Sequence, residues 1–270
     1  MNTLDYYLNT YLRSRPLFLS LIRSKEAYLF QGYLPLKHPV LDVGCGDGFF
    51  AKITFGDRGL SRIKNGFSQI DVGLDVSGSR VEEARKLGIY KKIVVYNGGK
   101  MPFPNNSFAT VVSNCVLEHI PNLSFTLKEI QRVLKPGGLF LTTVMAAPWE
   151  EYLFGNLLLG DWYKKWMRRK QGHYHLCAHK EWKKLFTKAG FSTISCEGYL
   201  SKTSSRLIDI AHYLSIPLLI SYKLMGKWVP IPAYTSLYPT TMLLRLLTTP
   251  TTPSTSAAMF FALQKPTTSR

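Results

Sequence analysis

The sequence predicts an α/β fold with a doubly wound, mostly parallel sheet, in which strands and helices alternate along the chain. The first observation is a glycine-rich turn at residues 40–50, VLDVGCGDGFF, where an apolar run with an acid is followed by three glycines at alternate positions. The second is an apolar stretch at residues 69–76, QIDVGLDV, with an acid near its end. The third is the repeated alternation of short apolar strands and helical segments, which crossover connections between parallel strands require.

The composition indicates a globular protein with an excess of positive charge. Of its 270 residues, 46% are hydrophobic and 13% aromatic, so the chain can bury a core and is not disordered overall. Its formal net charge is +17. This charge predicts attraction to an anionic partner, for which nucleic acid, anionic lipid headgroups and a charged metabolite are the alternatives.

The cysteines and the N-terminus predict a cytoplasmic protein. Four scattered cysteines fit no disulfide framework in a chain of this length, which favours a reducing compartment. Charged residues near the N-terminus interrupt the apolar segment that a signal peptide requires. The residues concerned are Cys45, Cys115, Cys177 and Cys196, and Asp5, Arg13 and Arg15.

Gly44, Gly46 and Gly48 predict a turn at which a ligand can approach the main chain. A residue without Cβ adopts backbone conformations that are closed to others, and the helix start after the turn is suited to nucleotide-like ligands. The spacing G-x-G-x-G is close to the dinucleotide-binding spacing G-x-G-x-x-G, so this turn alone leaves a dinucleotide as an alternative.

The second predicted strand holds two acids, of which only one reaches the ligand crevice. At ~3.3 Å per residue, Asp71 and Asp75 lie roughly 13 Å apart, and ligands bind at the carboxyl ends of the strands. Asp75 is therefore expected to accept hydrogen bonds from ribose hydroxyls, with the capping of a helix near Ser77 as the alternative. The long gap between Gly48 and Asp75 predicts a loop insertion at residues 56–66.

The spacing of apolar residues at 2–30 predicts one or two helices. These helices form either a lid packed beside the sheet or a helix at a membrane surface. The apolar face of this segment comprises Phe18, Leu21, Ile22, Tyr28 and Leu29, with Pro16 near a helix start. Further strands are predicted at residues 92–96, 108–113 and 139–144, and helices at 79–87 and 123–134, with Pro136, Gly137 and Gly138 ending the helix at 123–134.

Five ordered blocks carry a family resemblance: VLDVGCGDG, VGLDVS, MPFPNNSF, SNCVLEHI and EIQRVLKPGGLF. Over residues 39–144 they resemble the type 11 group of class I methyltransferases, which depend on S-adenosylmethionine (SAM). The resemblance implies a Rossmann-like, doubly wound sheet of seven strands, whose later elements include a helix at residues 180–189 and a strand at 191–197. It divides the chain into a helical extension (1–38), a SAM-binding core (39–200, with an insertion at 146–178), an apolar helical insertion or lid (201–256) and a final antiparallel core strand (257–266).

The resemblance also implies which residues hold SAM. The methionine end would contact Asp42 and the main chain of Gly44, Cys45, Gly46 and Gly48, the ribose would contact Asp75, and the adenine would contact Val76, Asn97 and Gly98, with Asn114 near the sulfonium. Two positions depart from the family pattern, because Asn97 and Ala109 stand where Asp is common. The side-chain oxygen of Asn97 can still accept a hydrogen bond from the exocyclic amine of adenine. Ala109 lies at the start of a predicted strand, away from the ligand crevice at the carboxyl ends of the strands.

The insertion expected after the fifth strand is rich in basic and aromatic residues. Trp162, Trp166 and Trp182 are interleaved with many Lys and Arg residues, as at a lipid interface or a base-stacking surface, although a solvated helix face is the alternative. Here His173, His175, Cys177 and His179 alternate, and a metal site is one interpretation. We expect no metal, because structural zinc usually takes its ligands from two separated pairs and the sequence shows no second pair. One of these histidines is instead expected to face the acceptor.

The apolar stretch at residues 206–247 is expected to form a lid over an apolar acceptor or a patch resting on a membrane, with Tyr222 and Trp228 at the interface. Charged and polar residues interrupt every run before the ~18 apolar residues of a spanning helix, so no transmembrane segment is predicted.

The leading hypothesis is a SAM-dependent methyltransferase that methylates a small, apolar or lipid-linked acceptor, in the cytoplasm or at an anionic membrane surface. An RNA or other nucleic-acid methyltransferase is the first alternative, although residues 113–116, SNCV, lack the Asn-Pro-Pro-Tyr type signature. A non-catalytic SAM-binding or scaffold protein is the second. A hydroxyl acceptor would need a base, for which we nominate His119, with His173 or His175 as alternatives; His119 could instead be structural.

Overall fold

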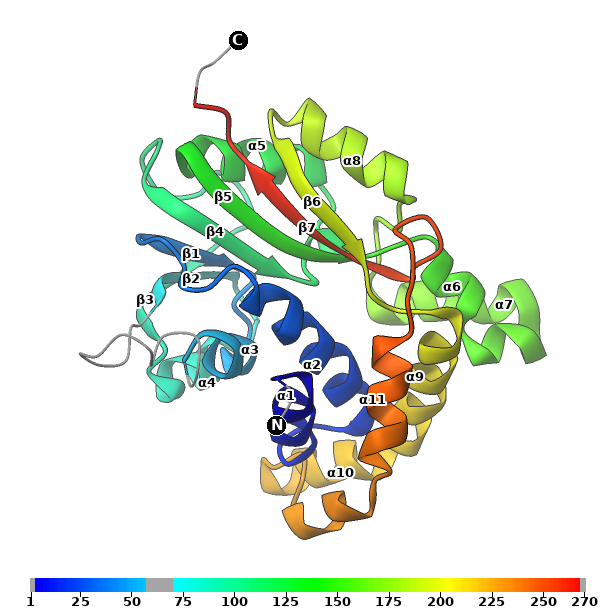
Figure 1. Ribbon diagram of the computed structural model, residues 1–270. Helices are drawn as coiled ribbons and strands as arrows, with labels where there is room; N and C mark the ends of the chain where they lie inside the picture. The colour runs from blue at the N-terminus through cyan, green and yellow to red at the C-terminus, as the bar shows by residue number, and fades with distance from the viewer. Residues whose placement is uncertain (1–2, 57–69, 268–270) are drawn as a thin grey trace.

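The computed structural model describes residues 3–56 and 70–267, which contain a seven-stranded sheet of order β3-β2-β1-β4-β5-β7-β6 (Figure 1). β7 runs antiparallel to β5 and β6, and every other pairing is parallel. This confirms the predicted Rossmann-like α/β fold. The strands are β1 (Val40–Val43), β2 (Ile70–Val76), β3 (Tyr90–Tyr96), β4 (Phe108–Asn114), β5 (Leu134–Met145), β6 (Ser192–Gly198) and β7 (Ala258–Gln264).

The sheet is covered on both faces, so successive residues of a strand enter two different cores. Val112 and Phe260 pack into the core that α2 and α4 share, whereas their neighbours Val111 and Phe261 pack into the core beneath α5 and α8. Figure 1 shows α5 and α8 on one side of the sheet and α2 and α4 on the other. These helices are α2 (Leu17–Gln31), α4 (Val81–Leu87), α5 (Leu123–Val133) and α8 (His179–Lys188).

The N-terminal segment forms α1 (Thr3–Leu12) and α2, which pack beside the sheet as a lid would. Leu21 and Leu29 of α2 are buried, and Phe30 makes an edge contact with Phe260 of β7. Tyr28, which the apolar pattern places on the same face, is instead exposed, and the Lys25 ammonium lies over its ring. The Tyr28 ring therefore lies on the protein surface and does not contribute to the core.

The two insertions form a layer of helices beyond the carboxyl ends of β5 and β6; in Figure 1, α9, α10 and α11 lie beside α1 and α2, and α6 and α7 lie on the other side of α9. The Tyr163 hydroxyl of α7 donates to the Asp209 carboxylate of α9 at 2.7 Å, which joins the two insertions. The helices are α6 (Pro148–Tyr152), α7 (Phe154–Gln171), α9 (Lys202–Leu214), α10 (Ile216–Met225), the short η3 (Pro232–Leu237) and α11 (Thr240–Thr248).

Within the described residues, no single helix combines the length and apolar composition needed to cross a bilayer. α9 and α10 meet that requirement only when taken as a pair, and they are bent by 49° relative to each other.

β5 begins earlier than the sequence pattern predicts. The strand starts at Leu134, directly after α5, and includes the Pro136-Gly137-Gly138 segment that was expected to end the helix. The register against β4 shifts at this point, between Phe108 and Thr110. A Cβ on Gly138 would lie 2.9 Å from the Ala109 carbonyl oxygen, so the two backbones approach too closely for a side chain. The loop insertion expected at residues 56–66 lies, beyond Gly56, outside the described residues.

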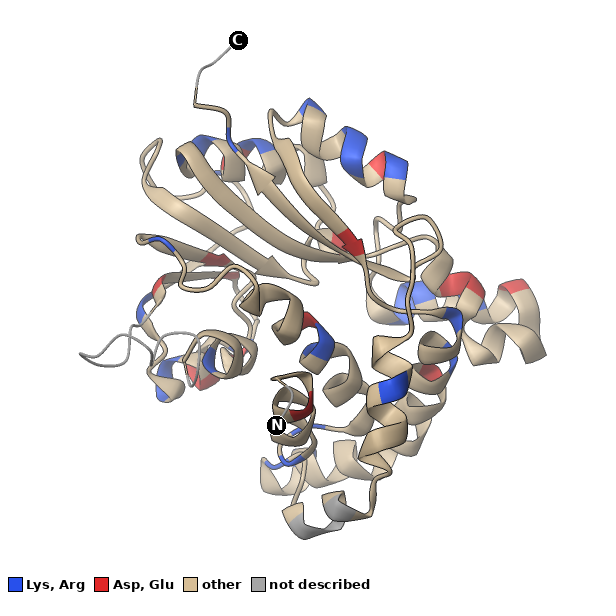
Figure 2. Ribbon diagram, viewed as in Figure 1, with Lys and Arg blue, Asp and Glu red and all other residues tan. Residues whose placement is uncertain are grey.

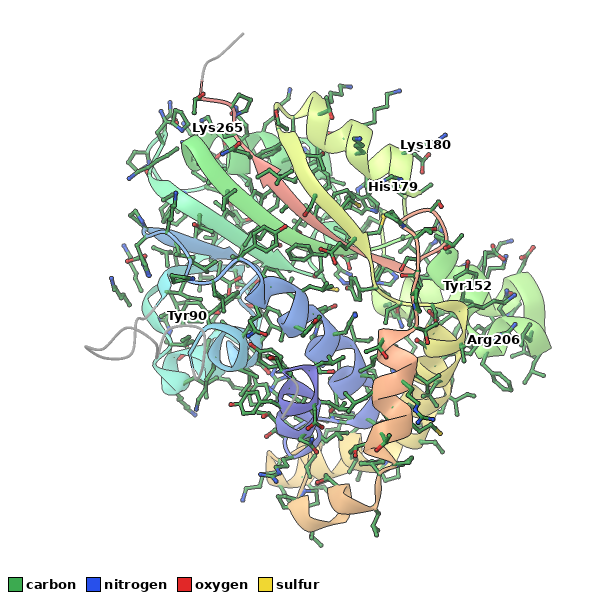
Figure 3. All side chains as sticks on the ribbon, viewed as in Figure 1. Tyr90, Tyr152, His179, Lys180, Arg206 and Lys265 are labelled. Atoms are coloured by element: carbon green, nitrogen blue, oxygen red, sulfur yellow. The ribbon has the colours of Figure 1, made fainter. Side chains whose placement is uncertain are left out.

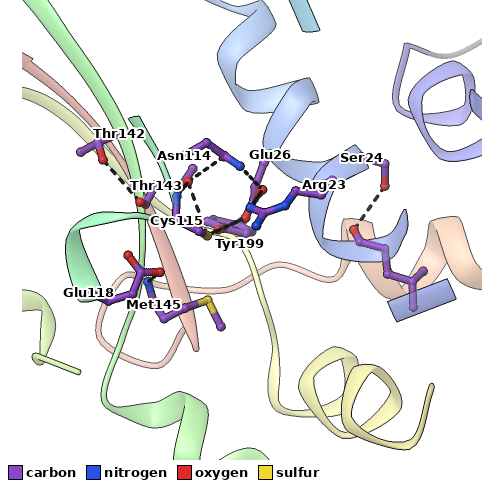
Figure 4. A network of polar contacts seen from close by, with 11 residues as sticks. Arg23, Ser24, Glu26, Asn114, Cys115, Glu118, Thr142, Thr143, Met145 and Tyr199 are labelled. Atoms are coloured by element: carbon purple, nitrogen blue, oxygen red, sulfur yellow. Dashed lines mark hydrogen bonds and ion pairs between the residues drawn. The ribbon is translucent and has the colours of Figure 1, made fainter. Parts of the chain in front are cut away.

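A buried carboxylate attaches α2 to the carboxyl end of the sheet (Figure 4). Glu26 is fully buried and accepts hydrogen bonds from Arg23 Nη1 at 2.6 Å, Asn114 Nδ2 at 3.0 Å, Cys115 Sγ at 3.0 Å and the Tyr199 hydroxyl at 2.8 Å. Asn114 and Cys115 lie at the end of β4, and Tyr199 follows β6. One carboxylate therefore connects three segments that are distant in the sequence.

We predict that Glu26→Ala lowers the free energy of unfolding by about 3 kcal/mol, because it leaves Arg23 and the other donors without their shared acceptor. Glu82→Ala is the matched control, since Glu82 pairs with Arg85 on the exposed side of α4, and it is expected to change stability by less than about 0.5 kcal/mol. Urea unfolding of the two variants measures the difference. Equal losses would show that the Glu26 contacts contribute little.

Candidate functional site

The glycine turn between β1 and the short helix α3 (Phe49–Ala51) has the backbone that its sequence predicts. Gly44, Gly46 and Gly48 all have positive φ, at 77°, 53° and 73°. The Gly44 and Cys45 amides donate to the Leu74 carbonyl at 2.8 and 3.2 Å, so the turn is held against β2. At Gly44 a Cβ would lie 2.4 Å from Val116 Cγ2, which leaves no room for a side chain. The turn therefore favours glycine at all three positions for conformation, and at Gly44 for space as well.

Asp75, near the end of β2, is bonded to the same turn. Its Oδ2 accepts from the Gly46 amide at 2.6 Å, and its Oδ1 accepts from the Val76 amide at 2.7 Å. The alternative role of Asp75 as a helix cap is wrong, because α4 follows Arg80 and has no side-chain cap. The carboxylate therefore stands at the carboxyl end of the sheet.

A cavity of about 500 Å³, here called the cofactor cavity, opens beside Asp75. It brings together five of the predicted cofactor residues: Gly44, Asp75, Val76, Asn97 and Gly98. Val76 is 44% exposed, which leaves an apolar surface for a flat ring. The cavity is completed by Val43, Tyr96, Val116, His119, Ile120, Pro121 and Asn122.

Asn97, one of the two departures from the family pattern, turns its side chain toward its own loop. Its Oδ1 accepts from the Gly99 amide at 3.0 Å, and Gly98 between them has a φ of 79°. The carbonyl oxygen thus stabilises the loop, while the amide nitrogen remains a donor at the rim of the cofactor cavity. The other departure, Ala109, lies near the start of β4, at the opposite end of the strand.

Asp42 does not line the cofactor cavity. It is buried beneath the glycine turn, where its Oδ2 accepts from the hydroxyl of Tyr90, labelled in Figure 3, at 2.6 Å. Burial raises the pKa of Asp42 to about 7, although the Tyr90 hydrogen bond opposes the shift. The structure thus gives Asp42 a contact with β3, whereas the resemblance implied a contact with the methionine end of SAM.

Asn114 is likewise turned away from the cofactor cavity. Its Nδ2 donates to Glu26, and its Oδ1 accepts from the Thr143 hydroxyl at 2.8 Å. Both polar ends of the amide are therefore used inside the protein, and a role near the sulfonium stays a prediction. The neighbouring Cys115 lines a second cavity.

This second cavity, here called the apolar cavity, has a volume of about 250 Å³ and lies between α2, α9 and the turn after β4. Phe18 and Ile22 of α2, Trp149 of α6 and Ile208 of α9 provide its apolar walls. His119 lines this cavity and the cofactor cavity. The structure thus has two adjoining spaces with an imidazole between them.

Glu118, His119 and His173 form a titratable cluster on the wall of the apolar cavity, with one ligand atom of each within 4.8 Å of the others. The main chain holds them together, because the Tyr174 and His175 amides both donate to the Glu118 carbonyl oxygen. The ring centroids of His119 and His173 lie 4.8 Å apart. His119 Nδ1 faces the Gly172 carbonyl oxygen at 3.2 Å, which leaves Nε2 for another partner.

Burial disfavours the charged form of each member of the cluster and shifts its pKa accordingly. It raises the pKa of Glu118 to about 7, lowers the pKa of His173 to about 4, and lowers the pKa of His119 below its ordinary 6.5. Glu118 Oε1 accepts from the Met145 amide at 3.2 Å, whereas Oε2 is buried without a hydrogen-bond partner among residues 3–56 and 70–267. Glu118 can therefore exchange a proton near neutral pH, whereas both imidazoles are neutral there.

The alternating residues after α7 do not converge on one point. His173 lies in the cluster, whereas His175 Nε2 faces the Pro121 carbonyl oxygen at 3.2 Å and the His179 ring stacks on Phe261. Cys177 pairs through its main chain with Ala146. Within the described residues, these side chains form no shared ligand set, and His175 lines neither cavity.

The place of Glu118 and the walls of the apolar cavity were not predicted from the sequence. Glu118 stands next to His119 in the block SNCVLEHI, and an acid beside a histidine after a buried strand was the available signal. Its burial could not be seen, because it depends on the 3₁₀ turn at Leu117–His119 and on the loop after α7.

Comparison with known proteins agrees with this architecture. A profile of the methyltransferase domain family matches residues 5–195. Sterol 24-C-methyltransferase erg6 of Aspergillus fumigatus is 30% identical over 140 residues, which cover 50% of this chain and 35% of that protein. The 2-methyl-6-phytyl-1,4-hydroquinone methyltransferase of Synechocystis sp. is 31% identical over 139 residues, covering 50% and 40%. The chain thus spans less than half the length of these two curated relatives.

A solved SAM-dependent methyltransferase of Thermotoga maritima has the same fold, with a TM-score of 0.57 over 97% of both chains at 16% identity. The family profile covers most of the chain, from the first N-terminal helix to β6. The chain therefore belongs to the methyltransferase domain family, with the class I SAM-dependent fold that its sequence predicts.

Proposed function

We propose that this chain is a SAM-dependent methyltransferase whose acceptor is a small apolar or lipid-linked molecule. The observation that carries the proposal is the position of His119, which lines both the cofactor cavity and the apolar cavity. A methyl donor in the first and an acceptor in the second would meet beside this ring. The sterol and phytyl-hydroquinone methyltransferases among the relatives support an apolar acceptor.

The residues of the cofactor cavity fit SAM. Asp75 can accept hydrogen bonds from ribose hydroxyls, because each carboxylate oxygen has a lone pair beyond the one that its backbone donor uses. Val76 offers its exposed face to the adenine ring. Asn97 Nδ2 can donate to a ring nitrogen, so the replacement of Asp by Asn changes which atom of the adenine edge is read. The methionine end would lie along the Gly44–Gly48 main chain.

When bound, SAM supplies a methyl group to the acceptor by in-line displacement at its sulfonium. The chain's own residues hold the acceptor and exclude water, a task for Phe18, Ile22 and Trp149 on the apolar walls. For a hydroxyl acceptor, His119 Nε2 takes the proton, since its lowered pKa keeps the imidazole neutral at pH 7. Glu118, buried beside it, offers a second proton acceptor.

A nucleic-acid acceptor is the second candidate, because Lys and Arg residues gather on α8 (Figure 2) and on α7. Fewer exposed aromatic side chains are available for base stacking than the sequence suggested. Of the three interleaved tryptophans, Trp182 is fully buried, and Trp162 stacks on Trp166. Only Trp162 exposes more than half of its surface to solvent. A retained fold without catalysis is the third candidate.

Asp75→Ala is expected to weaken SAM binding at least about tenfold, because one hydrogen bond to a charged group contributes about 1.5 kcal/mol or more. Asp71→Ala is the matched control on the same strand, since Asp71 bonds to His38 and Lys91 at the other end of β2 and should leave SAM affinity unchanged. Isothermal calorimetry with SAM and S-adenosylhomocysteine measures both. Equal weakening in the two variants would contradict a ribose contact at Asp75.

Labelled methyl from SAM, incubated with the protein and a cell extract, is expected in the organic-soluble fraction. Ile22→Trp should fill the apolar cavity, keep SAM affinity and reduce this label at least about tenfold, since a bulky ring excludes the acceptor. Ile194→Trp, at an exposed position of β6, is the control. Label in nucleic acid would instead support the second candidate, and SAM binding without any transfer would support the third.

With the labelled acceptor in hand, the rate should depend on pH through His119. Its pKa is lowered, so the base is charged and inactive only in acid, and kcat/KM should rise with pH through a midpoint below 6.5 and then level off. His119→Asn should remove this limb and lower the rate about 10²-fold or more. A flat profile from about pH 5 to 8 in the unmodified protein would mean that the acceptor needs no base.

A further inference from the structure

An apolar surface that no described element covers lies at the outer end of the helical layer. Its members, here called the α10 surface, are each more than half exposed: Leu214, Ile216, Ile220, Leu224, Met225 and Ile231. Single exposed apolar side chains are ordinary, but a group that continues along one helix and its flanks marks an interaction site.

α10 is apolar around its whole circumference and yet stands at the surface. Its sequence is IPLLISYKLM, and Ser221 is its only buried residue. Ile216, Ile220 and Leu224 succeed one another at intervals of four and form a stripe along the helix. A helix that is apolar on every side normally lies in a core or in lipid, and this helix has no core on its outer side.

The charged side chains that residues 210–270 contribute to the α10 surface are all basic, and Glu83 of α4 contacts Tyr222 at its edge. No Asp or Glu follows Asp209 in the chain, and Lys223 and Lys227 are exposed within the surface itself. The ribbon of α10 is mostly uncharged in Figure 2. Tyr222 and Trp228 stack with ring centres 4.4 Å apart at its edge. Apolar side chains with basic and amphipathic aromatic neighbours match the chemistry of an anionic lipid headgroup region.

Contacts to the core hold the α10 surface in position. The Tyr222 hydroxyl donates to Glu83 Oε1 of α4 at 2.9 Å, and the Arg80 guanidinium lies 4.9 Å from the centre of the Tyr222 ring. α9 connects the same surface to the apolar cavity, since Ile208 and His212 line that cavity and the helix ends at Leu214. A molecule dissolved in lipid beside α10 would thus meet the wall of the apolar cavity.

We propose that the α10 surface docks this protein on the headgroup region of an anionic phospholipid bilayer, where α10 lies in the interface without crossing it. The proposal adds a partner to the proposed function, because a bilayer would present a lipid-linked acceptor to α9. Docking itself needs neither SAM nor an acceptor. Each of the two proposals can therefore fail while the other holds.

Flotation with vesicles tests the docking. The full chain is expected to float with vesicles of phosphatidylcholine and phosphatidylglycerol, and more weakly with phosphatidylcholine alone. The double variant Ile220→Glu/Leu224→Glu should lose at least about tenfold in partitioning, because it places charge where apolar area is buried. Val95→Glu/Ile194→Glu is the matched control, at exposed apolar positions on β3 and β6, and should partition as the unmodified chain does.

The lysines and the oligomeric state complete the test. Lys223→Gln/Lys227→Gln should reduce binding to the anionic vesicles about fivefold per lysine, and high salt should have the same effect. No flotation of the unmodified chain, or an equal loss in both glutamate variants, would overturn the proposal. Sedimentation velocity adds a third contrary result: a dimer that Ile220→Glu/Leu224→Glu dissociates, without vesicle binding, would assign the surface to a second copy of the chain.

Discussion

The hydrogen bonds to the buried carboxylate of Glu26 are the interaction on which the position of α2, and with it the apolar cavity, depends. A charged group removed from water must be fully paired, and Glu26 meets this requirement by drawing Arg23, Asn114 and Tyr199 to one point. α2 is thereby held across the carboxyl ends of the strands, where it supplies walls of the apolar cavity. The same bonds keep the Asn114 amide inside the protein.

The two cavities are built from different kinds of structure, and this suits their different tasks. The cofactor cavity is formed by strand ends and the glycine turn, whose main chain is tied to Asp75 and Leu74. A group that is common to a whole family can be bound by such a rigid frame. The apolar cavity is formed by helices of the N-terminal extension and of the two insertions, which can differ in shape without disturbing the sheet.

The surface divides its basic and apolar character between different helices. α7 and α8 carry Lys and Arg, whereas the α10 surface presents apolar side chains with two exposed lysines, Lys223 in α10 and Lys227 just after it. The net charge of +17 attracts the chain to an anionic surface over a long range. The apolar side chains of the α10 surface then make the close contact. Electrostatic approach and hydrophobic adhesion can therefore reinforce one another on this chain.

Most of the sheet, the glycine turn and the place of Asp75 were predictable, because they depend on patterns within a few residues. The start of β5 was not, since the Pro136-Gly137-Gly138 segment signals a helix end locally and yet pairs with β4. Nor were the partners of the site residues. Asp42 bonds to Tyr90, and Glu118 and His119 meet His173, across long separations in the chain. The sequence by itself determined the class of fold and the type of ligand turn, because local periodicity and glycine conformation specify both. Only the tertiary structure decided which side chains share a cavity, because burial and pairing depend on segments that meet only in the folded chain.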